Sequence, residues 1–522
     1  MLTLPCLLVG CARFESKPLD PAQTAVELES RSLADPGLRR FLETNLGRDL
    51  PAWPLKSWDF PALTLAALYY HPSLDVARAQ WATARAGVKT AGGRPNPTVG
   101  VSPQYAFNPD KGVSPWVAAI NFDLPIETAG KRGDRIARAQ RLSESARLNL
   151  AAQAWQVRRY LRAALLDHAA AQRRAALLQE LLQTQQAILT LLEGRLAAGA
   201  IAAHELTPAR VAILKTQTDL TEARRQAVEN RARVAEALGL PFRALDGVDL
   251  AFDVPPTSEA ARDLASAEVR REALHRRADI LAGLAEYAAS QSALQLEIAR
   301  QYPDIHLSTG YEYDQGENKW GFLGLGTELP VLNRNQGPIA EAEAKRTESA
   351  ARFLALQAKV IAEIDRALAG RAAVQEQLRQ IDLLLDTDRK QVRSVEAMQQ
   401  AGAADQLELR TAQLEVRLAE LARLDALVKA QQALGQLEDA VQVPYPALRS
   451  VEQNPRAPVG PQSKSVSERG VHAASQSNST GRNPEASPSS SGQVKRRERR
   501  APGAAVPGGS EESRAPAQQE PK

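Results

Sequence analysis

Cysteine and methionine are almost missing from this sequence, with two of each among 522 residues. Thiolates and thioethers are the ligands that soft metal ions prefer, so the composition gives little support for a soft-metal site. Aromatic residues make up only 5% of the chain, which argues against a conventional globular enzyme. The 65 basic and 61 acidic residues nearly cancel, so the charge balance gives no case for nucleic-acid binding.

Long apolar runs are also missing. No window of about 18 uninterrupted apolar residues occurs, so we expect no membrane-spanning helix, although the alternating strands of a membrane β-barrel would escape such a search. The sequence has no phosphate-binding loop, no Gly-x-Ser-x-Gly motif and no credible catalytic triad, and its six histidines lack metal-ligand spacing. We therefore predict no catalytic residue, no metal site and no cofactor.

The N-terminus carries a short apolar run, Leu2 to Gly10, that ends just before Cys11. This run has the length of a secretory signal core and is too short to span a bilayer. A small residue followed by a cysteine resembles the lipobox of bacterial lipoproteins, so Cys11 is predicted to be lipidated after cleavage. No Lys or Arg precedes the run, in contrast to an ordinary signal. The alternative is an incidental apolar N-terminus.

The chain contains two similar segments, which indicates an internal duplication. In each segment a helical stretch leads to a proline-containing turn, then to two alternating strands and a Leu-Pro pair. Three pairs of landmarks match at nearly the same spacing: residues 71 and 277, Pro95 and Pro303, and Pro125 and Pro330. Agreement of three landmarks makes coincidence a poor explanation.

The strands of each segment have the length of membrane strands. They are predicted at residues 98–107, 116–124, 305–313 and 321–329, around polar turns at 108–112 and 314–319. A tilted strand of about 9 or 10 residues crosses a membrane. A sheet in a bilayer must close, and barrels have about eight strands or more, so four spanning strands require partner chains. The alternative is two ordinary soluble hairpins.

Very long helical stretches follow each strand pair, at about residues 133–239 and 339–441. Each is interrupted by a small-residue turn, at Gly199 and at Gly402, where glycine permits the left-handed backbone of a tight reversal. A helix of about 60 residues spans roughly 90 Å, far more than a compact domain needs. We therefore predict two projecting helical hairpins, each with an apolar seam.

Together, these features resemble the TolC family of outer-membrane efflux proteins over about residues 60–445. Two junctions, Leu124-Pro-Ile-Glu-Thr-Ala-Gly-Lys-Arg-Gly133 and Leu329-Pro-Val-Leu-Asn-Arg-Asn-Gln-Gly337, are similar to those of the cobalt-zinc-cadmium (CzcC-like) branch. The resemblance implies a mainly α fold with membrane β-strands. Four strands from each chain of a homotrimer would form a 12-stranded β-barrel, above a periplasmic tunnel of α-helical hairpins. It also implies a passive channel of a tripartite efflux system, with heavy-metal cations as the cargo of the branch.

The resemblance further implies partners at the hairpin tips, which in this family dock onto a periplasmic adaptor linked to an inner-membrane pump. Arg195, Leu196 and Gly199 match the Arg-Leu-x-x-Gly pattern of family tips. The second tip keeps Gly402 but has Met398 and Gln399 in place of Arg-Leu. Adaptor contact is thus better supported for the first tip.

Acidic residues follow both tips. Family channels narrow at the periplasmic end, often with acidic rings, and Glu205, Asp405 and Glu408 are candidates for such channel-entrance acids. The alternative is that they are ordinary charges at helix N-termini, which the helix macrodipole favours.

The C-terminal end of the chain is predicted to be disordered. The chain beyond about residue 450 is rich in Ser, Pro, Gly and charge, so we predict a disordered tail. The predicted location is the outer membrane, in contact with its lipid, with a lipid anchor and periplasmic helices. The competing interpretations are a periplasmic adaptor, which usually has one hairpin flanked by β-domains, and a coiled-coil scaffold. The predicted organisation has five parts. They are a signal with the lipobox cysteine (1–11), an extended N-terminal segment (12–58), two repeats (59–255 and 256–446) and the tail (447–522).

Overall fold

Long helices and one small sheet make up most of the described chain. The computed structural model describes residues 13–252, 267–314 and 316–442. The signal segment with Cys11 and the tail from residue 447 lie outside these residues. In chain order the elements are α1 (Pro21–Glu29), α2 (Pro36–Leu46), β1 (Ser57–Asp59), α3 (Phe60–Tyr70), α4 (Pro72–Ala91), β2 (Thr98–Tyr105), β3 (Trp116–Ile126), α5 (Lys131–Ala197), η1 (Ala203–Leu206), α6 (Thr207–Leu238), η2 (Phe242–Leu245), β4 (Asp249–Ala251), α7 (Ala267–Arg276), α8 (Ala278–Ala299), β5 (Ile305–Asp314), β6 (Glu317–Thr327), α9 (Gln336–Gln400) and α10 (Gln406–Val441).

The backbone makes the same turns in both repeats. Gly130 and Asn335 occupy equivalent positions, have φ of 75° and 61°, and directly precede α5 and α9. Gly199 and Gly402 are equivalent in the same way, have φ of 70° and 75°, and lie just beyond the ends of these two helices. Residues with positive φ are uncommon apart from glycine and asparagine, so these matched positions reflect the duplication in the sequence.

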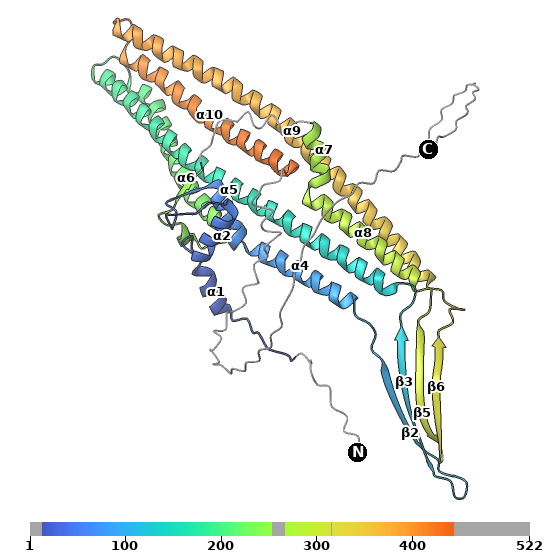
Figure 1. Ribbon diagram of the computed structural model, residues 1–522. Helices are drawn as coiled ribbons and strands as arrows, with labels where there is room; N and C mark the ends of the chain where they lie inside the picture. The colour runs from blue at the N-terminus through green and yellow to red at the C-terminus, as the bar shows by residue number, and fades with distance from the viewer. Residues whose placement is uncertain (1–12, 253–266, 315, 443–522) are drawn as a thin grey trace, which may run out of the picture. The chain divides into compact units, whose positions relative to one another are not determined.

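Four antiparallel strands form one sheet in the order β2-β3-β5-β6 (Figure 1). Each repeat supplies one hairpin, and β3 pairs with β5 across the repeats. Side chains alternate between two faces because successive residues of a strand point to opposite sides. No described residue of these strands is buried, and β2 and β6 are the two edges. One face is mainly apolar (Val99, Val101, Trp116, Ile120, Phe122, Leu124, Leu307, Tyr311, Trp320, Leu325) and the other is polar (Ser102, Asn121, Asp123, His306, Ser308, Glu312, Lys319).

The second hairpin turns earlier than the sequence predicted. The turn was expected at residues 314–319 and the returning strand at 321–329, but Asp314 already pairs with Glu317 and β6 ends at Thr327. Gly316 has φ of 103°, a conformation open to glycine that allows the chain to reverse at once. The polar residues that suggested a long turn therefore belong to the strand.

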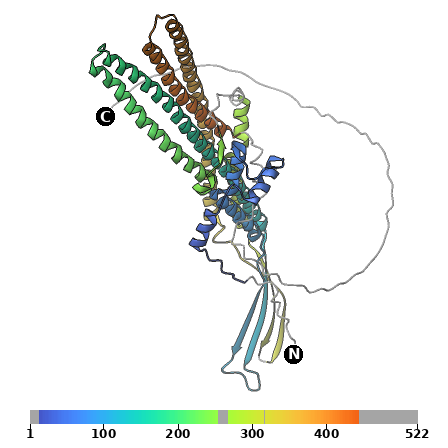
Figure 2. The ribbon, with the colours of Figure 1, turned by 90° about the vertical axis from the view of Figure 1, so that its left-hand side faces the viewer.

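The long helices lie side by side. In the hairpin region α5 packs on both α6 and α10, and α10 packs on both α5 and α9, which gives the order α6-α5-α10-α9. Figure 2 shows the α5–α6 hairpin in green beside the α9–α10 hairpin in brown. Nearer the sheet, α4 and α8 pack on α5, and α8 also packs on α9. None of the helices in the described ranges combines the length and apolarity that a membrane span requires.

Each helical hairpin has an apolar seam, and Leu414 and Leu421 of α10 also pack on the seam of the first hairpin. Leu178, Leu181 and Leu182 of α5 pack against Ile213 and Leu220 of α6. In the second hairpin the seam is formed by Leu378, Ala426, Leu427 and Ala430, with Val374 and Ile381 beside them. These residues recur at helical spacing, so burial of one stripe of each helix holds the pair together.

The N-terminal segment is not extended as predicted. The described residues 13–58 contain α1, α2 and the start of β1. The two helices form because Asp20 and Asp35 each cap a helix that begins with proline. Leu38 and Leu42 of α2 enter a core that also contains Trp58, α3 and parts of α5 and α6. β1 pairs in parallel with β4, a small sheet that the sequence did not reveal. This segment therefore joins the first repeat.

Candidate functional sites at the two ends of the long helices

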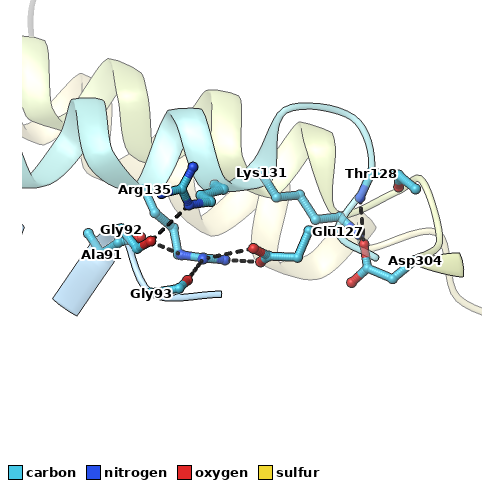
Figure 3. Close-up of polar contacts among 9 residues, drawn as sticks. Ala91, Gly92, Gly93, Glu127, Thr128, Lys131, Arg135 and Asp304 are labelled. Atoms are coloured by element: carbon cyan, nitrogen blue, oxygen red, sulfur yellow. Dashed lines mark hydrogen bonds and ion pairs between the residues drawn. The ribbon is translucent and has the colours of Figure 1, made fainter. Parts of the chain in front are cut away.

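The junction between β3 and α5 ties the first repeat to the second (Figure 3). The backbone amide of Thr128 donates to Asp304 Oδ1 at 2.9 Å, and the Thr128 hydroxyl donates to the carbonyl of Pro303 at 2.6 Å. Lys131 Nζ lies 2.7 Å from the same Asp304 oxygen, and the side chain of Lys131 is only 10% exposed. One carboxylate at the start of β5 thus fixes the first turn of α5.

Partial burial of Asp304 opposes its ionisation, yet the pKa of Asp304 lies below its usual value. The hydrogen bonds from Lys131 and from the Thr128 amide, together with the positive charge of Lys131, outweigh that burial. The carboxylate is therefore charged at neutral pH, and the ion pair with Lys131 is present under ordinary conditions.

Basic residues of α5 also hold the C-terminal end of α4 (Figure 3). Arg135 forms a two-pronged ion pair with Glu127 and donates to the carbonyls of Ala91, at 3.3 Å, and Gly93, at 3.0 Å. Arg132 Nε donates to the carbonyl of Gly92 at 2.8 Å. The last carbonyls of a helix lack partners within the helix and carry partial negative charge, so guanidinium groups stabilise them. The hydrogen bond with Glu127 raises the pKa of Arg135 further.

In the second junction an amide side chain takes the place of the basic residues, and Asn335 Nδ2 also lies 3.1 Å from Glu297 Oε2. Asn335, just before α9, donates its side-chain amide to the carbonyl of Glu297 at 2.7 Å, at the end of α8. Leu329, Val331 and Leu332 precede it and are exposed, Leu332 by 96%. The same backbone turn is therefore fixed by an ion pair in the first repeat and by amide hydrogen bonds in the second, where exposed apolar residues precede it.

The two hairpin tips share one backbone motif. In the first, the amides of Gly199 and Ala200 donate to the carbonyls of Leu196 and Arg195, both at 2.9 Å. In the second, the amides of Gly402 and Ala403 donate to Gln399 and Met398 at 2.9 and 2.8 Å. This is the pattern of a helix that ends on a left-handed glycine. The tips thus differ in their side chains, as the sequence indicated, and not in their backbones.

The side chains bring the two tips together. Arg195 of the first tip forms an ion pair with Asp405 of the second, a contact between the two repeats that no local pattern could reveal. Asp405 also accepts from the Glu408 amide at 2.9 Å. That hydrogen bond, and the charge of Arg195 to a lesser extent, lowers the pKa of Asp405.

All three acids proposed for the channel entrance cap helices. The Glu408 carboxylate accepts from the Asp405 amide at 3.2 Å, which completes a capping box at α10. The Glu205 carboxylate accepts from the Ala202 amide at 2.8 Å at the start of η1. These contacts account for each acid as a helix-terminal charge, and all three side chains are also exposed. Within the described ranges, no group of three or more His, Cys, Asp or Glu residues could hold a metal ion.

Comparison with known proteins identifies the chain. The family model "Outer membrane efflux protein" matches residues 63–240 and 269–441, one match in each repeat. The chain belongs to the outer membrane efflux protein family. It is therefore an outer-membrane channel component of an efflux system, as the sequence predicted, rather than a periplasmic adaptor or a scaffold.

Relatives and solved structures agree with this membership. The chain is 26% identical over 319 residues to the cobalt-zinc-cadmium resistance protein CzcC of Cupriavidus metallidurans, covering 60% of this chain and 73% of that one. It is 29% identical over 278 residues to the pyoverdine export outer membrane protein OpmQ of Pseudomonas putida, covering 49% and 56%. The outer-membrane channel OprN has the same fold, with a TM-score of 0.62, 20% identity, and coverage of 83% and 98%. These relatives are channel proteins, not enzymes.

Proposed function

We propose that three copies of this chain form one passive exit duct, in which each four-stranded sheet supplies a third of a closed 12-stranded barrel. The observation that carries the proposal is the sheet itself, with one apolar face, one polar face and two edges, β2 and β6, left without a neighbouring strand in the described chain. Unpaired backbone groups are too costly in a bilayer for an open sheet to span it. Closure by further copies satisfies both edges at once.

The orientation of such a barrel follows from its two faces. The apolar face would meet lipid, and the polar face with Asp123, His306 and Glu312 would line the water-filled interior. Tyr105 packs against Trp116 at the turn end of the first hairpin, and Tyr311 packs against Trp320 in the second. Aromatic pairs of this kind suit the boundary between lipid and water.

The hairpin tips are proposed to dock onto a periplasmic adaptor, which would connect the duct to an inner-membrane pump. Arg195, Leu196, Gly199 and Gly402 all lie at the tips, and both glycines are exposed. The ion pair between Arg195 and Asp405 presents the two tips as one surface. Attraction of cations by Glu205, Asp405 and Glu408 at the entrance remains a prediction.

The adaptor proposal is tested by pull-down with purified periplasmic adaptor proteins of the same organism. Replacing Leu196 by Asp at the first tip should abolish capture, whereas replacing Met398 by Asp at the second tip should weaken capture less. Equal capture by both variants and by the natural chain would contradict docking at the tips.

Heavy-metal cations are the cargo that we propose. The relative CzcC is named for cobalt, zinc and cadmium resistance and matches over more of this chain than OpmQ, which is named for pyoverdine export. Expression in a host that lacks its own metal-efflux channel should restore tolerance to cobalt, zinc or cadmium. Restored export of a siderophore without metal tolerance would favour the alternative cargo.

A lipid anchor at Cys11 is proposed from the sequence alone, since Cys11 lies outside the described residues. Mass spectrometry of the N-terminal peptide should show a diacylated or triacylated cysteine. An unmodified Cys11 in the mature chain would refute the anchor and leave the channel proposal intact.

The duct itself is tested by its assembly. Outer-membrane extracts should contain a species of three chains that collapses to one chain on heating, and the purified protein should conduct ions across a planar bilayer. A single chain that salt washing releases from membranes would overturn the proposal.

A further inference from the structure

Asp123 and His306 form a pair on the polar face of the sheet. His306 Nδ1 lies 2.9 Å from Asp123 Oδ2, and the Ser308 hydroxyl donates to Asp123 Oδ1 at 3.2 Å. Asp123 lies in β3 of the first repeat, and both of its partners lie in β5 of the second. Both carboxylate oxygens are therefore held by β5, and the pair exists only because the two repeats share one sheet.

The carboxylate decides which nitrogen of His306 carries the hydrogen. An ionised carboxylate only accepts hydrogen bonds, so Nδ1 must donate, and Nε2 of the neutral ring then carries a lone pair. Within residues 13–252, 267–314 and 316–442, Nε2 has no hydrogen-bond partner. The side chain of His306 is 46% exposed. Nε2 is thus an available ligand atom on a surface that water can reach.

Glycines on the neighbouring strand leave His306 uncovered. In the register of β5 and β6, His306 is opposite Gly326 and Ser308 is opposite Gly324. A Cβ at Gly326 would lie 3.6 Å from the Cβ of His306, so a larger side chain at this position would stand beside the imidazole. Without such side chains, the ring is accessible from the polar side of the sheet.

The other histidines of the described chain lack this arrangement. His71 and His168 use Nδ1 in hydrogen bonds with groups other than carboxylates, and His168 is buried. His204 and His275 are exposed on helical segments, and no carboxylate in the described ranges accepts a hydrogen bond from either. Among these histidines, His306 alone combines exposure with a carboxylate that orients the ring.

A histidine held in this way suits a particular class of metal ion. Imidazole nitrogen binds ions such as Zn²⁺, Ni²⁺ and Cu²⁺, whereas Mg²⁺ prefers oxygen ligands. Metal-bound histidines commonly donate their second ring nitrogen to a carboxylate, which fixes the ring and makes the ligand nitrogen more basic. Asp123 and His306 are 183 residues apart, so no spacing in the sequence could reveal the pair.

We propose that His306, oriented by Asp123, is a weak and reversible binding site for Zn²⁺ and similar cations on the inner wall of the channel. One protein ligand, with water in the remaining positions, binds more weakly than the four protein ligands of a structural zinc site. Weak binding suits a duct, because cargo must leave the wall as readily as it arrives. The inference rests on the proposed duct with its polar face inward, and it names a side chain that would contact the cargo.

Zinc titration of the full-length protein in a planar bilayer tests the site. In a KCl gradient, bound Zn²⁺ adds positive charge to the channel wall and should shift the reversal potential toward anion preference. The shift should need about tenfold less Zn²⁺ than Mg²⁺, because Mg²⁺ does not bind imidazole and acts mainly by screening. His306→Gln should remove this difference between the two ions.

The matched control is His204→Gln, which removes another exposed imidazole near the first hairpin tip and should leave the zinc response unchanged. Loss of the response in His204→Gln but not in His306→Gln would place the binding at the helical end and overturn the proposal. Equal action of Zn²⁺ and Mg²⁺ on the natural channel would also overturn it and leave the duct intact. A protein that conducts no ions would overturn the duct, and this inference with it.

Asp123 is a positioning residue in this proposal. Asp123→Asn should raise the Zn²⁺ concentration needed for the shift about tenfold, because the ring is no longer fixed by a carboxylate. Glu312→Gln removes the same charge from the same face, six residues beyond His306 on β5, and should raise that concentration much less. Equal effects of the two variants would show that Asp123 acts only through its charge and does not orient His306.

A second histidine tests the orientation of the first. Residues two apart in a strand share a face, so Ser308→His places another imidazole beside His306. Two imidazoles that bind one Zn²⁺ together should lower the concentration needed by about tenfold or more. Thr309→His, on the apolar face, is the matched control and should give no gain. If Ser308→His gives the same gain in a His306→Gln background, His306 is not a ligand and the proposal is wrong.

Discussion

Asp304 shows how much of the junction depends on one carboxylate. It accepts hydrogen bonds from the Thr128 amide and from Lys131, and so links the start of β5 to the start of α5. Asp304→Asn keeps the shape but removes the charge, and should lower the free energy of unfolding by about 1 kcal/mol, since the pair is only partly buried. Urea unfolding in detergent measures this change. Asp219→Asn, on an exposed face of α6, is the matched control and should have no effect.

The ion pair between Asp304 and Lys131 also predicts that the stability of the fold depends on pH. The pKa of Asp304 is lower in the folded protein than in the unfolded chain, so its contribution is present above about pH 4 and is lost as the pH falls through the folded-state pKa. The stability difference between the natural protein and Asp304→Asn should therefore shrink at low pH. A difference that stays constant down to about pH 2 would show that the effect of the substitution is not electrostatic.

The pKa of Asp439, in α10, is shifted in the opposite direction to the pKa of Asp304. Its side chain is only 18% exposed, and burial raises its pKa to about 6 despite the nearby guanidinium groups of Arg158, Arg159 and Arg162. Between about pH 4 and pH 6 the folded state holds a proton that the unfolded chain has lost, so stability falls as the pH rises through this window. Asp439→Asn removes this loss and should stabilise the protein at pH 8 but not at pH 4. Lower stability of the variant at pH 8 would instead show that the carboxylate is needed by its arginine neighbours.

Among the elements, the ends of helices depend on single backbone positions. Gly239 ends α6 with φ of 71°, and a Cβ there would lie 2.8 Å from the carbonyl oxygen of Tyr70. Gly247 has the same φ of 71°, but a Cβ there would meet nothing within 4 Å. Gly247→Ala should therefore lower the free energy of unfolding by about 1 kcal/mol, because the left-handed backbone alone is unfavourable for alanine.

Gly239→Ala should cost more, about 2–4 kcal/mol, because the α3–α4 connection must also move. The midpoints of urea unfolding of the two variants, compared at the same dependence of free energy on urea concentration, measure how much the close contact with Tyr70 adds to the backbone strain. Equal losses of unfolding free energy in both variants would show that the backbone near Tyr70 moves without an energetic penalty.

The elements themselves could be predicted where their periodicity was strong. The alternating runs that became β2, β3 and β5, and the glycine turns at Gly199 and Gly402, were visible in the sequence because each depends on neighbouring residues. β6 was placed too late, since polar residues of a strand that faces water resemble a turn. β1 and β4 are three residues each and pair from opposite ends of the first repeat, so neither carries a local signal.

The candidate site residues likewise differ in whether a local sequence pattern could reveal them. The tip residues were found through a local motif, whereas the pairs of Arg195 with Asp405 and Lys131 with Asp304 join the two repeats and depend on the fold. The offset between repeats was the one signal that could have found such contacts.

The polar face of the sheet leads to a prediction for the assembled channel. Asp123 and Glu312 lie on this face, and Lys319 is the partner of Glu312 in the strand register. Acidic side chains that line a pore raise the local concentration of cations. Asp123→Asn with Glu312→Gln should therefore lower the ratio of cation to anion permeability, measured as a shift in reversal potential across a planar bilayer in a salt gradient. Thr309→Val, on the apolar face next to the same strands, should leave the reversal potential unchanged. A shift caused by Thr309→Val and not by the acidic pair would mean that the faces are reversed, with the apolar side toward the pore.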